Sequence, residues 1–72
     1  MTVDEAAAEL KPLAPREIKV LMLSAKGLEC EDIAKALGMK RSTVYWHRKM
    51  AVQHLDMSYS KAIVLMAKAG WV

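Results

Sequence analysis

Two apolar-patterned stretches separated by only three residues constrain the fold of this chain more than any other feature. The first stretch predicts a short helix over residues 30–37, and the second predicts a longer helix over 41–55. Their inward faces carry Ile33, Ala34 and Leu37 in the first helix and Val44, Ala51, Val52 and Leu55 in the second. Gly38, in the connection, permits the positive φ that a sharp turn needs. The two helices must therefore pack directly against each other, with the small Ala34 at their closest approach.

Prolines and glycines mark the other helix boundaries. Pro15 suits a first helical position and Gly27 a stop, which predicts a helix over residues 15–26. A further helix is expected over 60–69, closed by Gly70. Its expected inward face consists of Ala62, Ile63, Met66, Ala67 and Ala69. Alternation of apolar and polar residues is absent, so no strand is expected. The predicted fold class is all-α, a four-helix domain over residues 13–72.

Residues 1–12 lie before this domain and are rich in alanine and glutamate. We expect an N-terminal extension, either a frayed helical turn or a disordered segment. The whole chain has 72 residues, which is enough for one domain only.

Charge is distributed unevenly along the chain. Its net value is only +3, yet none of the eight acidic residues lies between positions 33 and 55. That window contains Lys35, Lys40, Arg41, Arg48 and Lys49, together with both histidines. A basic stretch between acidic ones is typical of a nucleic-acid-binding face. On charge alone, a solvated helix surface that happens to be basic explains the pattern equally well.

The composition argues against several other classes of protein. Cys30 is the only cysteine, so no disulfide forms, and a reducing cytoplasmic location is expected. No signal peptide is visible and no apolar run approaches the roughly 20 residues that span a bilayer, so no membrane association is expected. A nucleophile–base–acid set and a glycine-rich phosphate loop are absent. His47 and His54 lack partner ligands, and we expect neither an enzyme nor a metal or other cofactor.

The segment 33–55 has the layout of a helix-turn-helix, in which the second helix enters the major groove of DNA. At this point the sequence resembles the LuxR-type (GerE-like) family of bacterial transcription regulators. The matching residues are Leu13, Pro15, Arg16, Glu17, Val20, Leu21, Ala25, Gly27, Ile33, Ala34, Leu37, Gly38, Thr43, Val44, His47 and Leu55. The resemblance implies a sequence-specific regulator that binds double-stranded DNA. The fourth helix, which ends with Gly70-Trp71-Val72, argues against the related promoter-reading region of sigma factors.

The resemblance also implies which residues would contact DNA. Tyr45, Trp46 and Lys49 fall where the family reads base edges. Backbone-contacting or helix-orienting positions are occupied by Thr43, His47 and Arg48. Lys40, at the end of the turn, and Arg41 and Ser42, which open the second helix, complete the candidate DNA-binding residues. Alternatives remain for four of these residues: Trp46 as a core residue, Lys40 and Arg41 as solvated turn charges, and His47 as a packed structural side chain.

A weak homodimer is expected because one recognition helix covers too few base pairs to find a site in a genome. The resemblance implies pairing through the last helix, whose expected outer surface consists of Val64, Leu65, Lys68 and Trp71. Ordinary exposed side chains, or a Trp71 that folds back on the core, are the alternatives. A rival surface for a partner protein is formed by Ile18 and Met22.

The sequence departs from the family pattern at helix caps. Ala14, Glu29 and Lys40 stand where the family has capping hydroxyl residues. These departures keep a second function open: a protein-interaction module of the same fold that binds another regulator or RNA polymerase. The chain has no room for the sensing domain of many family members, so we expect either a stand-alone regulator or a fragment.

Overall fold

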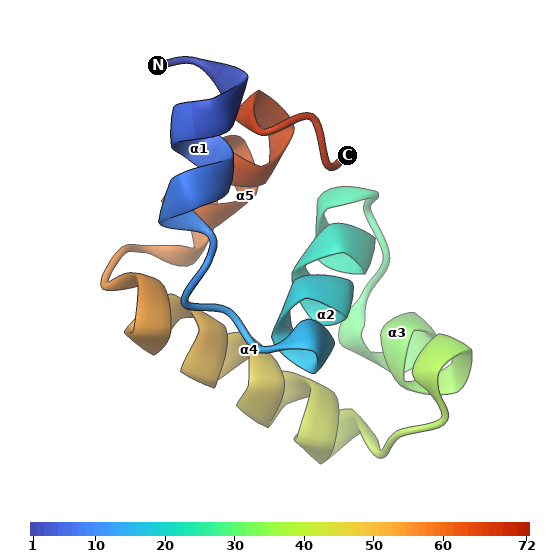
Figure 1. Cartoon of the computed structure of the whole chain (residues 1–72). Helices are drawn as coiled ribbons and strands as arrows, with labels where there is room; N and C mark the ends of the chain where they lie inside the picture. The colour runs from blue at the N-terminus through green and yellow to red at the C-terminus, as the bar shows by residue number, and fades with distance from the viewer.

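The computed structural model describes all 72 residues and contains five α-helices and no strand. The helices are α1 (Val3–Glu9), α2 (Pro15–Ala25), α3 (Cys30–Leu37), α4 (Arg41–Leu55) and α5 (Tyr59–Lys68). The all-α fold class is therefore confirmed, and the four predicted helices begin and end within one residue of their expected positions. In Figure 1, α4 is the long helix along one side of the molecule, and α1 lies beside α5.

The N-terminal segment is helical rather than disordered. A capping box starts α1, because Thr2 Oγ1 accepts from the Glu5 N–H at 3.1 Å while Glu5 Oε1 accepts from the Thr2 N–H at 3.2 Å. Ala6 and Leu10 have no exposed surface, since they pack against α5 and the rest of the core. Residues 1–12 thus add a fifth helix to the expected four.

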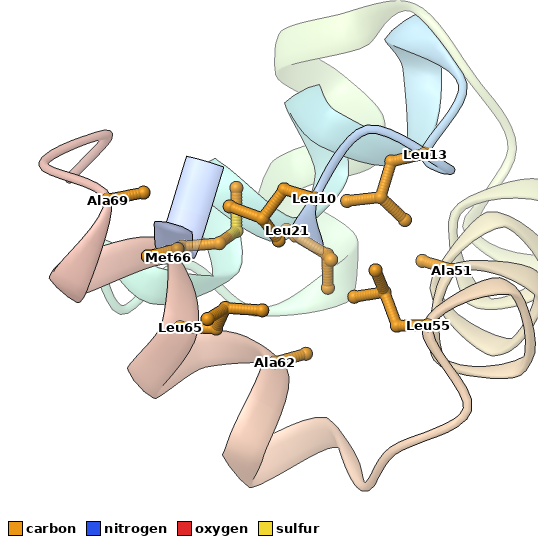
Figure 2. Close-up of a cluster of buried hydrophobic side chains, with 10 residues drawn as sticks. Leu10, Leu13, Leu21, Ala51, Leu55, Ala62, Leu65, Met66 and Ala69 are labelled. Carbon is orange, nitrogen blue, oxygen red and sulfur yellow. The ribbon is translucent and has the colours of Figure 1, made fainter. Parts of the chain in front are cut away.

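The larger of two hydrophobic clusters joins α1, α2, α4 and α5. Figure 2 shows its side chains converging, with Leu10 and Leu21 near the centre. Its ten members are Ala6, Leu10, Leu13, Leu21, Ala51, Leu55, Ala62, Leu65, Met66 and Ala69. A cluster that draws on four helices places α4 against the body of the molecule along its C-terminal half.

A smaller cluster holds the helix-turn-helix together. Val20 of α2 packs with Ile33 and Ala34 of α3 and with Val44 of α4, and half-buried Leu37 and Met39 adjoin it. Gly38 ends α3 at φ +66°, in the left-handed region, which lets the Met39 N–H donate to the Ala34 carbonyl at 2.9 Å. The predicted packing of the two helices across this turn is confirmed.

Two side chains of α5 face the opposite way from their expected directions. Leu65, expected on the outer surface, is only 5% exposed and points into the larger cluster in Figure 2. Ala67, expected inside, is exposed. The reason is α1: it packs along α5 and shifts the buried face of that helix toward Leu65. Trp71 is half-buried and folds back against the same cluster, as one alternative proposed.

A polar contact connects the beginning of α2 with the end of α4. Ala14, Glu29 and Lys40 provide no side-chain cap, as the sequence indicates. Glu17, which is 3% exposed, instead accepts from the Ala14 N–H at 2.7 Å. Its carboxylate also lies 2.9 Å from Nδ1 of the more exposed His54. One buried carboxylate therefore caps α2 and ties it to the last turn of α4.

Asp56 ends α4 in a left-handed conformation with φ +52°, the only non-glycine residue with positive φ. This conformation brings Cβ too close to the following carbonyl oxygen, and the carboxylate faces the negative end of the helix dipole. We expect Asp56→Gly to raise the free energy of unfolding by about 0.5–1 kcal/mol, measured by urea denaturation. Asp56→Ala is the matched control: it removes the charge but keeps Cβ, so it should give only the smaller, electrostatic part of this gain. Equal gains in both variants would assign the effect to charge rather than backbone conformation.

Candidate nucleic-acid interface

The outer face of α4 is defined by the burial of its opposite side. Val44, Ala51 and Leu55 are buried in the two clusters. Consequently Tyr45 and Trp46 are directed outward, with 62% and 56% of their surfaces exposed. Lys49 and Gln53 are exposed one and two turns further along the helix. The base-reading residues expected from the sequence therefore share an open surface.

Trp46 is not a core residue, which removes one of the alternatives. Its ring meets that of half-buried His47 edge to face, with ring centroids 5.1 Å apart and an interplanar angle of 66°. Aromatic pairs favour this geometry, which limits the rotation of both side chains. The contact presents a preformed aromatic surface at the first turns of α4.

The turn before α4 concentrates positive charge. Lys40, Arg41 and Ser42 are exposed, and Thr43 is half-buried. Neither cation forms an ion pair, because the Glu17–His54 contact is the only one in the structure. Lys40 offers no side-chain cap, and no acidic residue occupies the first turn of α4. The positive end of the helix dipole and two unneutralised cations thus lie together.

Arg48 lies between the outer and inner faces of α4 and is half-buried. Its guanidinium carbon is 3.8 Å from the centroid of the Tyr59 ring, at the start of α5. Nη1 also lies 3.8 Å from Sγ of Cys30, the first residue of α3. Sequence reasoning missed Tyr59 and gave Cys30 no role here, because neither residue shares a helix with Arg48.

Comparison with known protein families identifies the family of this chain. Residues 11–67 match the family model described as bacterial regulatory proteins, luxR family. The chain belongs to the LuxR family. Individual curated proteins give no match. The family assignment makes the chain a helix-turn-helix DNA-binding regulator, and α3 and α4 with the turn between them have the layout of that motif.

The two other surfaces expected on this LuxR-family domain differ in exposure. Ile18 and Met22 of α2 are half-buried and pack against the larger cluster, so little of either remains for a partner protein. On α5, Val64 is 53% exposed and Lys68 is exposed. Both line a hollow of about 380 Å³ between α1 and α5, whose lining is Met1, Glu9, Met57, Ser60, Lys61, Val64, Leu65 and Lys68.

The domain has no group of three metal-ligating side chains, and none of its helices is long and apolar enough to cross a membrane. His47 and His54 have different neighbours: His47 contacts Trp46, whereas His54 pairs with Glu17. Neither histidine belongs to a group of three such side chains. The site is therefore best described as a cationic and aromatic protein surface.

Proposed function

We propose that this LuxR-family domain is a sequence-specific regulator of transcription that inserts α4 into the major groove of DNA. The observation that carries the proposal is the outer face of α4, which combines exposed Tyr45, Trp46 and Lys49 with no acidic residue along the helix. The buried face of the same helix is held by two clusters, so the outer side chains project from a rigid support. A bacterial regulator of this kind would work in the cytoplasm, where the DNA is.

Each outer side chain suits a different part of a DNA duplex. Lys49 can donate to the O6 and N7 acceptors of guanine, and the Trp46 ring offers apolar contact for a thymine methyl group. Tyr45 adds a phenolic hydroxyl beside them. At the turn, Lys40 and Arg41 would neutralise backbone phosphates with the help of the α4 dipole. Ser42 and Thr43 supply hydroxyl donors to the same backbone.

Recognition of another regulator or of RNA polymerase is the alternative function. Exposed tryptophan and tyrosine side chains are also typical of protein interfaces, and Trp46 with Tyr45 forms such a pair. The two functions differ in their response to salt and to DNA sequence. A protein interface of this aromatic kind would leave DNA binding weak and unselective.

The decisive experiment is selection of bound duplexes from a random DNA pool, followed by a salt titration of the winning sequence. The proposal expects an enriched motif and a linear fall of log K with log salt, with a slope of about −0.9 for each phosphate contacted. Enrichment of no motif, with binding no tighter than to unrelated DNA, would reject the proposal. In that case, recovery of purified RNA polymerase on the immobilised domain would support the alternative.

We also propose that two copies pair weakly through α5 and more tightly on DNA. Helix-turn-helix proteins commonly bind half-sites whose centres lie about 34 Å apart, or a multiple of that distance. The hollow beside α5 contains apolar Val64 and Met57 as well as Glu9 of α1 and Lys61 of α5. Across a two-fold axis, the glutamate of one copy can face the lysine of the other. The small size of this surface accounts for weak pairing in solution.

Val64→Glu tests this pairing because Val64 is exposed, whereas a charge at the buried Leu65 would unfold the domain. We expect the variant to keep its helical content and lose cooperative binding to a palindromic site, by about tenfold in affinity for the full site. Sedimentation analysis and titration of half-site and full-site DNA measure the effect. Ala67→Glu, also exposed on α5 but outside the hollow, is the control. Unchanged cooperativity in Val64→Glu would place the dimer contact elsewhere.

A further inference from the structure

Arg48 is a half-buried cation without a carboxylate partner. Its guanidinium lies against the Tyr59 ring and the Cys30 thiol, and the one ion pair of the protein involves other residues. Moving a guanidinium partly out of water is costly unless charge and hydrogen bonds compensate it. Stacking on a phenol ring recovers part of this cost and fixes the plane of the group. The N–H groups at the edge of the guanidinium can still donate hydrogen bonds to an anionic acceptor.

A notch of about 180 Å³ lies at this place, between α4 and the beginning of α5. Its lining consists of Tyr45, Arg48, Lys49, Val52 and Tyr59. Two of these residues are cations, two are phenols that can donate hydrogen bonds, and none is acidic. Tyr59 is also the first residue of α5, so the positive end of that helix dipole adds to the local potential. The notch is therefore built to favour an anion.

The notch is continuous with the outer face of α4, because Tyr45 and Lys49 belong to both. We infer that it receives one backbone phosphate of the DNA strand bordering the groove that α4 enters. Arg48 binds the phosphate, and Tyr59, acting through its ring, is the residue that positions Arg48. This inference rests on the proposed function. The family resemblance left Arg48 either a backbone-contacting or a helix-orienting role; the notch favours backbone contact and adds Tyr59, a residue outside the helix-turn-helix.

Phosphate binding by Arg48 and positioning of Arg48 by Tyr59 predict different effects of substitution. Arg48→Met removes the charge but keeps an apolar stem, so the domain should stay folded. It should weaken DNA binding on the order of tenfold and make the salt slope shallower by about 0.9, without changing the preferred sequence. Tyr59→Phe keeps the stacked ring and should change affinity much less than Tyr59→Leu. The double variant Arg48→Met, Tyr59→Leu should bind no more weakly than Arg48→Met alone, because the two residues act as a unit.

The test measures binding to the selected duplex and to duplexes that carry one neutral methylphosphonate at successive positions. One position should weaken the wild-type protein and have little further effect on Arg48→Met, which identifies the contacted phosphate. Arg16→Met removes one exposed arginine from α2 and is the control for a general effect of charge. Inorganic phosphate, added as a competitor, tests whether the notch binds a free anion. Millimolar inorganic phosphate should not displace the DNA.

Three results would overturn the inference. Equal changes in affinity and slope for Arg48→Met and Arg16→Met would show only a general charge effect, and the proposed function would stand. Displacement of DNA from wild type but not from Arg48→Met by millimolar inorganic phosphate would make the notch a site for a free anion. A wild-type protein that binds no DNA would reject the proposed function, and the phosphate assignment with it.

Discussion

Leu10→Ala is expected to lower the free energy of unfolding by about 2–5 kcal/mol. Leu10 follows α1, has no exposed surface and packs in the larger cluster with Leu21 of α2 and Leu65 of α5. The loss combines the transfer free energy of the removed atoms with the cavity left among four helices. Because small domains are stable by only about 5–15 kcal/mol, urea denaturation and thermal melting will both detect it.

Val3→Ala provides the matched control, since Val3 lies on α1 but is largely exposed. Its effect should stay within about 0.5 kcal/mol. Equally small losses in the two variants would show that α1 is detached from the core in solution. The four remaining helices would then form the stable unit, and Leu65 would become available on the surface of α5.

Replacing Arg41 and Lys49 together by alanine is expected to reduce affinity for the selected DNA site on the order of 100-fold or more. Both side chains are exposed and form no ion pair, so the fold should be unaffected. The single variants should differ in kind: Lys49→Ala should relax sequence preference, whereas Arg41→Ala should weaken all sequences alike. Fluorescence anisotropy at fixed salt, on the selected site and on a scrambled one, measures both properties.

The control removes the same number of charges elsewhere, at Lys11 and Lys19, which are exposed and lie outside α4. We expect it to lose affinity only through the general potential, severalfold at low salt and less as salt rises. If it lost as much as the Arg41 and Lys49 double variant, the outer face of α4 would have no special role. The groove-facing surface would then have to be sought on another helix.

Much of the fold follows from local signals. Glycine and proline boundaries with a helical apolar period placed four helices within one residue of their observed ends. The first helix was expected at most as a frayed turn, because its seven residues, mostly alanine and acidic, are too few for a helical period to reveal a buried face. Leu65 was misplaced for the same reason: the direction of its burial depends on a neighbouring helix that the pattern did not show.

Part of the candidate site could also be predicted from the sequence, and part could not. Once Val44 is known to face inward, the helical period alone directs Trp46 and Lys49 outward, as the structure shows. The pattern could place Arg48 at the edge of the inward face but not show what it contacts, because its environment is made by α3 and α5. Contacts between a side chain and distant helices depend on tertiary packing. The periodicity of α4 therefore cannot predict that the short loop after it brings Tyr59 against Arg48.

Helix α4 is attached to α2 at two places. Near its start, Val44 packs in the smaller cluster with Val20, and near its end His54 pairs with Glu17. These attachments lie about 15 Å apart along the helix axis, since each residue advances about 1.5 Å. A rod held at two points resists pivoting, so α4 would enter a groove at a preset inclination. In such a complex the duplex must bend or twist to match the protein, and sites with easily deformed pyrimidine–purine steps would be favoured even where no side chain touches them.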